Sequence, residues 1–337
     1  MILVTGGTGY IGSHTCVALV QAGHELVIVD NLCNSHIGVL DRLATLCGSR
    51  PNFVEGDVRD SAVLAQVFAK YPITAVMHFA GLKAVGESVA MPFAYYENNV
   101  NGSVQLLKAM RQAAVKTLVF SSTATVYAGP FDTGLTEDAP RGAAHPYGRS
   151  KLMVEDLLAD LHAAEPDWRI ARLRYFNPVG AHESGLIGET PQGIPNNLFP
   201  YLAQVASGQR KRLSVWGNDY PTADGTGVRD YLHVMDLADA HLAALKYLMT
   251  PATPAESLLT LNLGTGKGHS VLEVIGAFEQ ACGREIPYVI APRRAGDLPQ
   301  YWADSRLAEK LLAWKAQRTL AQMCEDAWRW QRLSGGA

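Results

Sequence analysis

The stretch ILVTGGTGYIG, residues 2–12, decides the fold of this chain. Its first four residues are apolar or β-branched and predict a short buried strand. Gly6, Gly9 and Gly12 follow at once, so the backbone can turn tightly there and approach a ligand closely. A helix that begins after this turn offers free N–H groups and a positive dipole end to a pyrophosphate. The stretch therefore predicts a strand, turn and helix that together hold a dinucleotide.

The rest of the first half continues this alternation of strand and helix. Apolar runs predict strands at 25–29, 52–56, 75–79, 117–122 and 169–175, and helical spacing predicts helices at 11–23 and 104–115. This order predicts an α/β fold of the Rossmann type, a doubly wound parallel sheet with helices on both faces.

The composition of the chain and its pattern of elements change near residue 177. Long loops rich in Gly, Pro and Asn occupy 177–197 and 217–230, and long irregular stretches are usually functional. Helical patterns return at 234–249 and 271–282. We therefore expect an NAD-binding domain over 1–176 and a smaller α/β substrate-binding domain over 177–337, with 234–265 returning to the first domain.

Asp30 ends the second predicted strand, 18 residues after Gly12. An acid at this place accepts hydrogen bonds from both ribose hydroxyls of NAD and repels the additional phosphate of NADP, so we predict NAD as the cofactor. A second glycine stretch, GTGKGHS at 264–270, lacks the spacing of a P-loop because Lys267 is followed by Gly268. We predict that it is a turn leading into a helix.

The segment HPYGRSK, residues 145–151, places Tyr147 and Lys151 four residues apart. On a helix these side chains share a face, and an ammonium beside a phenol lowers the pKa of the phenol from about 10. Ser121, Ser122 and Thr123 end a predicted strand, where ligands bind in open α/β sheets. We predict Tyr147 as a general base, Lys151 as its cationic partner and Thr123 as a hydroxyl that bonds the same substrate oxygen.

Composition excludes several classes of partner and site. The chain has 29 Lys and Arg against 32 Asp and Glu, which leaves no positive excess for nucleic acid or an anionic membrane. Its five cysteines are scattered and form no CxxC pair, so neither a disulfide framework nor a zinc site is indicated. We expect His78 and His233 to be structural, predict no metal, and find neither a signal peptide nor a membrane span. A soluble, cytoplasmic protein is expected.

Further segments carry a resemblance to a known family. They are TGGTGYIGSH (5–14), HFAGLKAVGES (78–88), SSTATVY (121–127), PYGRSK (146–151), RYFNPVGAH (174–182), PQGIPNNL (191–198), VRDYLHVMDLA (228–238) and APRRAGDLPQYWAD (291–304). The chain resembles the extended short-chain dehydrogenases/reductases and is specifically similar to the UDP-glucose 4-epimerase family. Two positions depart from the family pattern. Thr123 stands where Ser is common and keeps the hydroxyl, and Ala128 stands where Gly is usual, in the loop 128–142.

The resemblance implies a reaction in galactose metabolism, the interconversion of UDP-galactose and UDP-glucose by transient oxidation at C4. Tyr147 takes the proton of the sugar 4-OH while the C4 hydride passes to NAD. The 4-keto sugar then turns about its diphosphate and receives the hydride on its other face. The resemblance also implies a homodimer that pairs helices near 98–113 and 147–164.

The resemblance further implies a fuller set of site residues. Those for the cofactor are Gly6, Gly9, Tyr10, Ile11, Gly12, Asp30, Asn31, Asn34, Asp57, Val58, Phe79, Ala80, Lys83, Asn98, Ser121, Tyr147, Lys151 and Tyr175. Those for the UDP-sugar are Thr123, Tyr147, Asn177, Asn197, Leu198, Trp216, Arg229, Arg294, Asp297 and Tyr301. The two arginines can each offer a fork of donors to the diphosphate, Trp216 is expected beside the uracil, and Asp297 is expected to accept from the uridine ribose.

Three alternatives compete with this interpretation. A nucleotide-sugar 4,6-dehydratase needs an Asp-Glu pair after the active-site Thr, and here Ala124 and Thr125 follow Thr123. A regulator that only senses the dinucleotide need not keep both Tyr147 and Lys151. A UDP-N-acetylglucosamine 4-epimerase needs a wide sugar pocket, whereas the resemblance implies that Tyr301 forms a bulky wall near the sugar 2-position, unless it only packs against Trp302.

Overall fold

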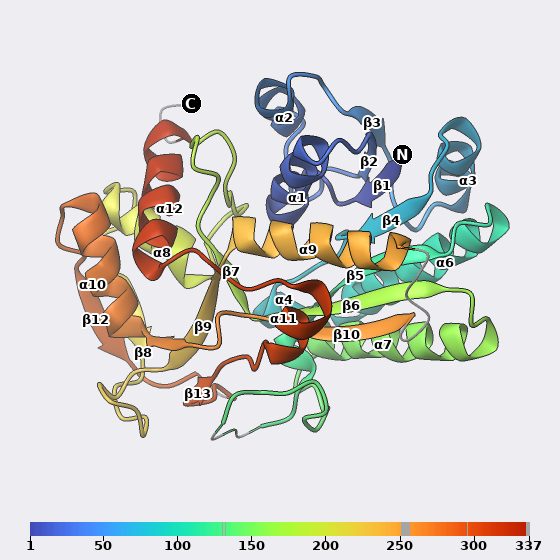
Figure 1. The fold of residues 1–337 in the computed structure, drawn as a ribbon. Helices are drawn as coiled ribbons and strands as arrows, with labels where there is room; N and C mark the ends of the chain where they lie inside the picture. The colour runs from blue at the N-terminus through green and yellow to red at the C-terminus, as the bar shows by residue number, and fades with distance from the viewer. Residues whose placement is uncertain (130, 132, 251–256, 295, 335–337) are drawn as a thin grey trace. The chain divides into compact units, whose positions relative to one another are not determined.

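A parallel sheet forms the centre of the first compact unit of this computed structural model, which describes residues 1–129, 131, 133–250, 257–294 and 296–334 (Figure 1). Within these residues the sheet has seven strands in the order β10-β6-β5-β4-β1-β2-β3. Strand β1 pairs in parallel with β2 on one side and β4 on the other, so the strand order reverses beside β1. This topology confirms the Rossmann-type fold. The strands are β1 (Ile2–Thr5), β2 (Leu26–Asp30), β3 (Asn52–Glu55), β4 (Ala75–His78), β5 (Thr117–Thr123), β6 (Arg169–Tyr175) and β10 (Leu258–Leu263).

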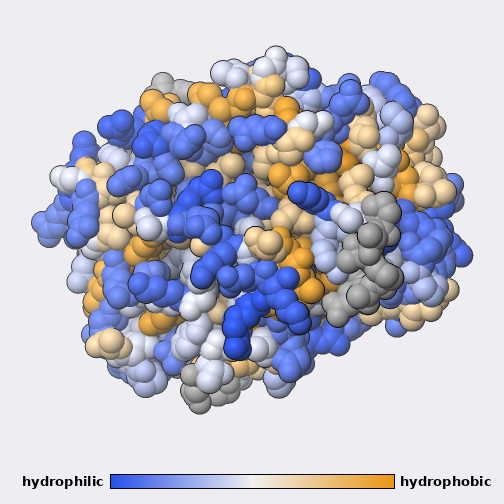
Figure 2. Space-filling view, viewed as in Figure 1, coloured by the Kyte–Doolittle hydropathy of each residue, from blue (hydrophilic) through white to orange (hydrophobic). Residues whose placement is uncertain are grey.

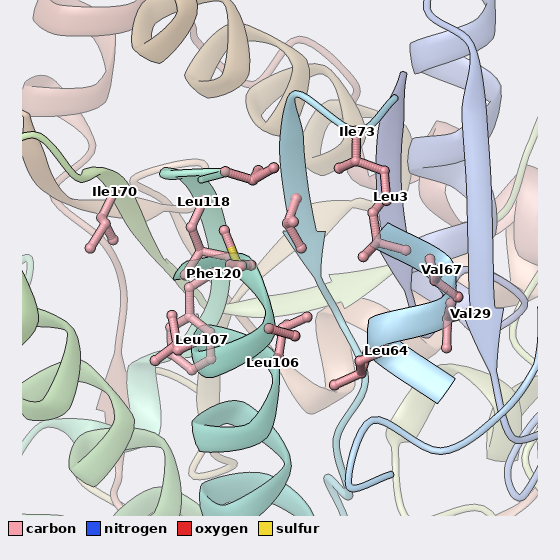
Figure 3. Close-up of a cluster of buried hydrophobic side chains, with 14 of the residues drawn as sticks. Leu3, Val29, Leu64, Val67, Ile73, Leu106, Leu107, Leu118, Phe120 and Ile170 are labelled. Carbon is pink, nitrogen blue, oxygen red and sulfur yellow. The ribbon is translucent and has the colours of Figure 1, made fainter. Parts of the chain in front are cut away.

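Helices follow the strands of this sheet and bury apolar faces against it. Leu64 on α3 and Leu106 and Leu107 on α6 point toward the strands and pack around Leu3 and Phe120 (Figure 3). Each such side chain contributes about 1.5–3 kcal/mol when it is fully buried. The helical segments are α1 (Tyr10–Gln21), α2 (Val39–Cys47), α3 (Ser61–Lys70), α4 (Val85–Ala90), α5 (Pro92–Tyr95), the π-helix η1 (Tyr96–Asn101), α6 (Gly102–Gln112), the 3-10 turn η2 (Ala124–Val126), α7 (Pro146–Ala164) and α9 (Val234–Met249).

The second unit is built from small sheets, three packed helices and the short helix α11. Strand β9 pairs in parallel with β7 and β13 and antiparallel with β11, while β8 pairs in parallel with β12. Helices α8, α10 and α12 share a core that includes Phe199, Phe278 and Met323. The elements are β7 (Asn177–Val179), α8 (Leu198–Ala206), β8 (Leu213–Trp216), β9 (Val228–His233), β11 (Gly268–Ser270), α10 (Val271–Cys282), β12 (Tyr288–Ala291), β13 (Gln300–Tyr301), α11 (Arg306–Leu312) and α12 (Leu320–Ser334).

The unit boundaries differ from the expected domain boundaries in the segment 129–139 and by a few residues at 176, 234–237 and 262–265, all of which belong to the second unit. Unit 1 comprises Met1–Ala128, Pro140–Tyr175 and Ala238–Leu261, and unit 2 comprises Gly129–Ala139, Phe176–Leu237 and Asn262–Ala337. The segment 129–139 belongs to the second unit because Leu135 N–H donates to the Trp302 carbonyl (2.9 Å) and Asn262 Nδ2 donates to the Leu135 carbonyl (2.7 Å). Residues 251–256 of the expected returning segment lie outside the described residues. The assignment of cofactor to one unit and substrate to the other stays a prediction.

The surface carries polar and apolar side chains in mixture, as the face in Figure 2 shows. Among the helices of the described residues, none is both long and apolar enough to span a membrane.

Candidate active site

The glycine turn lies between the end of β1 and the start of α1. Gly6 has a positive φ of 72°, and a Cβ at this position would come within 2.6 Å of the Ala80 nitrogen. A Cβ on Gly12 would lie 2.2 Å from the Gly6 carbonyl oxygen. Both positions therefore require glycine. Gly9 caps α1 without a side-chain hydrogen bond, and the N-terminus of a helix at such a turn is a favourable place for an anionic group.

A cavity opens beside this turn, at the carboxyl ends of β1, β2 and β4. Its lining includes nine residues that the sequence predicted for the cofactor, which are Gly6, Gly9, Asp30, Asn31, Asn34, Val58, Phe79, Ala80 and Asn98. The sequence did not single out the remaining lining residues, Val29, Cys33, Ser35, Gly56, Gly81 and Leu82. Tyr10, Ile11, Gly12, Asp57, Lys83, Ser121, Tyr147, Lys151 and Tyr175 are not among the lining residues. This place in the sheet is where ligands bind in open α/β folds.

The Asp30 carboxylate is held in place at this cavity. It accepts hydrogen bonds from the backbone N–H of Thr8 (3.1 Å) and of Leu32 (2.9 Å), and from Ser35 Oγ (3.2 Å). A fixed anion beside the glycine turn suits ribose hydroxyls and opposes a ribose phosphate, so the residues present fit NAD. Ser35 Oγ also bonds Thr8 Oγ1 (2.7 Å), and the signal for Ser35 in the sequence is only its place shortly after Asp30.

Asp57 supports the cavity from outside its lining. Its carboxylate accepts from Asn31 Nδ2 (2.8 Å) and from Arg59 Nε (2.8 Å), and this contact with Arg59 holds the pKa of Asp57 well below its usual range. The pair of Asp57 and Arg59 therefore fixes Asn31, which does line the cavity.

Two other residues of the predicted cofactor set contact each other. The Lys83 ammonium lies 5.8 Å from the centre of the Tyr10 ring at the start of α1.

Tyr147 and Lys151 lie in the first two turns of α7. His145 caps the helix, since its Nδ1 accepts from the Gly148 N–H (3.1 Å), and its ring stacks parallel to that of Tyr147 at 5.9 Å. The Lys151 side chain is buried and donates from Nζ to the Ser121 carbonyl (2.7 Å). Burial lowers the pKa of Lys151 to about 8. A Cβ on Gly81 would lie 3.4 Å from Lys151 Nζ, so the ammonium reaches the loop that lines the cavity.

Thr123 ends β5 close to the start of α7. Its Oγ1 accepts from the Thr125 N–H (3.2 Å) and opens the 3-10 turn η2. A Cβ on Gly148 would come within 2.7 Å of the Thr125 carbonyl oxygen, so the first turn of α7 packs directly on η2. The structure therefore brings the segments that carry the three predicted catalytic residues to one end of β5. A phenol, an ammonium and a hydroxyl gathered there suit proton transfer to and from a hydroxyl group.

Asn99 is a residue of this site that the sequence reasoning missed. It is buried in the π-helix η1, and its side chain donates to the Leu82 carbonyl (3.0 Å) and to Ser150 Oγ (3.0 Å). Ser150 Oγ in turn donates to the Tyr147 carbonyl (2.7 Å). Asn99 thus links a cavity loop to the helix of the predicted base, and π-helices are frequent at functional sites. The one signal in the sequence is the pair Asn98-Asn99, of which only Asn98 was singled out.

Tyr175 and Ser121, both predicted for the cofactor, lie near one another on neighbouring strands. The Tyr175 hydroxyl bonds His241 Nε2 (2.5 Å) on α9, and burial raises the pKa of this tyrosine. Ser121 contributes its carbonyl to Lys151. Of these residues, Ser121 therefore contacts the buried lysine directly.

Four of the predicted substrate residues form a cluster in the second unit. The Arg229 guanidinium lies 4.7 Å from the centre of the Tyr301 ring, and its Nη2 is 3.6 Å from Asp297 Oδ1. The Tyr301 hydroxyl donates to Asn177 Oδ1 (3.3 Å). Tyr301 also packs against Phe176, with ring centres 5.9 Å apart. We call Asn177, Arg229, Asp297 and Tyr301 the Arg229 cluster.

The other predicted substrate residues lie elsewhere in the second unit. The Arg294 guanidinium stacks on the exposed ring of Trp216 at 4.7 Å. Asn197 precedes α8, whose first residue is Leu198, and its Nδ2 donates to Glu189 Oε1 (3.0 Å). An exposed indole beside a guanidinium offers a flat apolar surface and a charge together.

The second glycine stretch differs from the expected turn before a helix. Strand β11 lies between the turn and α10, and the N–H groups of Thr265 (2.8 Å) and Gly266 (3.0 Å) donate to the buried Asp230 carboxylate. Amides that bond the chain's own carboxylate do not form a phosphate cradle, which agrees with the absence of a P-loop spacing.

The two histidines that we expected to be structural have protein partners. His78 bonds Thr5 Oγ1 (2.7 Å) and Ser103 Oγ (3.0 Å), and burial lowers its pKa to about 3, so its ring is neutral near pH 7. His233 Nε2 lies 3.2 Å from Asp326 Oδ2. In the part of the chain that the structure describes, no group of three or more His, Cys, Asp or Glu side chains is arranged to hold a metal ion.

Known proteins match this chain over nearly its whole length. It is 57% identical over 331 residues to the UDP-glucose 4-epimerase of Yersinia pestis, covering 98% of this chain and 97% of that protein. The crystal structure of the enzyme from Stenotrophomonas maltophila, described with bound NAD and formylated UDP-arabinopyranose, is 53% identical with a TM-score of 0.96, and covers 100% of this chain and 99% of that chain. That from Bifidobacterium longum, in complex with NAD+ and UDP, is 50% identical with a TM-score of 0.94, and covers 99% and 98%.

A family model agrees with these relatives. The model of the NAD dependent epimerase/dehydratase family matches residues 2–255, which include the glycine turn, Asp30, Thr123, Tyr147 and Lys151. This protein therefore belongs to the NAD dependent epimerase/dehydratase family.

Proposed function

We propose that this protein is a UDP-glucose 4-epimerase, which interconverts UDP-galactose and UDP-glucose with bound NAD. The observation that carries the proposal is the packing of the first turns of α7, with Tyr147 and Lys151, against the end of β5 and the loop of the dinucleotide cavity. The similarity to UDP-glucose 4-epimerases over nearly the whole chain supports the same activity. A dehydratase is disfavoured because Ala124 and Thr125 provide no acid/base pair for elimination.

The cavity residues would hold the cofactor. The glycine turn and the start of α1 would bind the pyrophosphate, Asp30 with Asn31 and Asn34 would bind the adenosine ribose, and Val58 would flank the adenine. When bound, NAD supplies an acceptor and donor for the hydride at sugar C4. Lys151 would bind the nicotinamide ribose, because its ammonium already lies against the Gly81 loop.

Tyr147 would take the proton of the sugar 4-OH and return it after the sugar has turned. Lys151 favours the phenolate form of this tyrosine through its charge, which is present below a pKa of about 8. Thr123 would hold the same oxygen by a hydrogen bond. The Thr125 N–H, which donates to Thr123 Oγ1, fixes that side chain and leaves its hydroxyl hydrogen for the substrate or for Thr125 Oγ1.

The second unit would bind the UDP part. Arg229 and Arg294 would contact the diphosphate, Asn177, Asn197 and Leu198 the diphosphate and uracil region, Trp216 the uracil, and Asp297 the uridine ribose. The stacked pairs of Arg229 with Tyr301 and Arg294 with Trp216 support these assignments. Tyr301 packs on Arg229 and Phe176, and we propose that it also limits the space beside the sugar 2-position, so that UDP-sugars without an N-acetyl group are preferred.

A homodimer in the cytoplasm completes the proposal. An apolar surface formed by α4, α5, the residue between them and α7 supports self-association, because Val89, Met91, Phe93 and Met153 are each about half exposed or more. Phe93 is 88% exposed, which is unusual for a phenylalanine on a monomer. Light scattering after size exclusion would measure the mass, and a monomer at micromolar concentration would contradict the dimer.

The decisive experiment uses purified protein without added NAD. We expect UDP-galactose to be converted to UDP-glucose, and the cofactor released on denaturation to be NAD or NADH. A 4-keto-6-deoxy sugar as the product would indicate a dehydratase. Bound NAD without any turnover of UDP-galactose or UDP-N-acetylgalactosamine would indicate a sensor.

A further inference from the structure

The Arg229 cluster holds one guanidinium from several sides. Arg229 and Tyr301 are direct partners in the parallel pairing of β9 with β13, which places the guanidinium over the tyrosine ring at 4.7 Å. Arg229 Nη1 also donates to the Val228 carbonyl (2.8 Å) and lies 3.5 Å from the Pro299 carbonyl. The ring and the two carbonyl groups therefore hold the guanidinium in one orientation. Only 16% of the Arg229 side chain is exposed.

Tyr301 is itself fixed, so it can act as a rigid support. Its ring packs against Phe176, and its hydroxyl donates to Asn177 Oδ1. An arginine has several rotatable bonds, and holding its fork in advance reduces the entropy that ligand binding must overcome. A flat ring under the guanidinium provides such a hold, because cation and ring attract each other over a broad contact.

We propose that Tyr301 is a positioning residue for Arg229, which it holds ready for the diphosphate of a nucleoside-diphosphate sugar. The inference rests on the proposed function and assigns Tyr301 a role beyond that of a wall beside the sugar. It follows that a small residue at 301 both widens the sugar space and weakens the grip on the nucleotide, even for a ligand that has no sugar.

The test measures the affinity of UDP itself for the NAD-loaded protein by isothermal titration calorimetry. UDP lacks the sugar, so a wall beside the sugar does not affect its binding. We expect Tyr301→Cys to raise the Kd of UDP by about 3- to 30-fold, the range of a cation–π contact. Tyr301→Phe keeps the ring and loses the bond to Asn177, so it should raise the Kd by less than about 3-fold.

A double-mutant cycle with Arg229→Met shows whether Tyr301 acts through the arginine. In the Arg229→Met background, Tyr301→Cys should change the Kd of UDP by less than about 2-fold, because the group that it positions is gone. An equal loss in both backgrounds would mean a direct or general structural role and would overturn the inference. So would a Kd of Tyr301→Cys within about 2-fold of the wild type.

Two controls separate this result from other failures. Tyr301→Cys loses ring packing and should unfold at a lower temperature than Tyr301→Phe, so both variants are compared well below their unfolding temperatures, where each should retain bound NAD and a cooperative unfolding transition. If wild-type protein fails to bind UDP at all, the proposed function fails. If the wild type binds UDP and Tyr301→Cys binds it equally well, only the inference fails.

Discussion

The dinucleotide cavity in the first unit and the Arg229 cluster in the second unit are built by different means. The cavity depends mainly on backbone, since a glycine turn, a helix start and three strand ends form it, and Asp30 is fixed by two backbone N–H groups. The cluster depends on side chains that stack on one another, with Phe176, Tyr301 and Arg229 in series. A backbone site tolerates little change at its glycines, whereas a stacked site can be altered one side chain at a time.

The largest expected effect is that of Tyr147→Phe. This change removes the proton acceptor and leaves both binding sites, so kcat should fall by about 10²–10⁴-fold while NAD stays bound and UDP affinity stays within about 2-fold. Steady-state turnover of UDP-galactose, together with the NAD content, measures this. A variant that keeps more than about a tenth of the wild-type kcat would show that the base is misassigned.

A smaller effect is expected for Asp30→Asn, which tests the cavity alone. The change keeps the size of the side chain and removes its charge, and hydrogen bonds to charged groups contribute about 1.5–3 kcal/mol, or about 10- to 150-fold in affinity. NAD retention should fall and discrimination against NADP should relax, as measured by cofactor released from the purified protein. UDP affinity is the matched control and should change little. Mostly NADP(H) in the wild type would refute the assignment.

Tyr301→Cys tests the cluster through the sugar. A close-packed wall accepts additional volume at a cost of about 1–3 kcal/mol, or about 5- to 150-fold in selectivity. We expect the ratio of kcat/KM for UDP-galactose to that for UDP-N-acetylgalactosamine to drop by this order in the variant. Equal ratios in the two proteins would mean that Tyr301 does not limit the sugar pocket. The support that Tyr301 gives to Arg229 is tested separately, by the affinity for UDP.

The smallest effect is the pH dependence that the buried Lys151 imposes. Its pKa is lowered to about 8, so its charge is half lost at that pH and mostly lost one pH unit higher, and kcat should decline by about fivefold between pH 8 and 9. The folded state binds fewer protons than the unfolded state between about 8 and 10.4, so the contribution of Lys151 to stability rises with pH over that window. Activity should therefore fall where this contribution to stability improves.

The conservative variant Lys151→Arg serves as the control for this pH profile. An arginine keeps its charge at every pH in the assay, so whatever activity remains should not decline above pH 8. A decline at the same pH in both proteins would assign the titration to another group.

Local signals were sufficient for the parts of the site that a short stretch of backbone forms. The glycine turn is readable from residues 2–12, because Gly6 has a positive φ of 72° and Gly12 packs on the Gly6 carbonyl, although the close approach of Gly6 to Ala80 is a tertiary contact. Tyr147 and Lys151 share a face because both lie on one helix, α7. The order of strands and helices likewise predicted the sheet, since apolar runs of the right length are a local property.

Only the tertiary structure decided the contacts between distant segments. Asn262 and Leu135, 127 residues apart, join Gly129–Ala139 to the second unit, and nothing near residue 135 indicates this. Tyr301 and Asn177, 124 residues apart, meet because β7 and β13 both pair with β9. Asn99 reaches Ser150 only because η1 and α7 pack together. Such partners depend on the pairing of elements and side-chain packing across the chain, which residue spacing along the sequence does not encode.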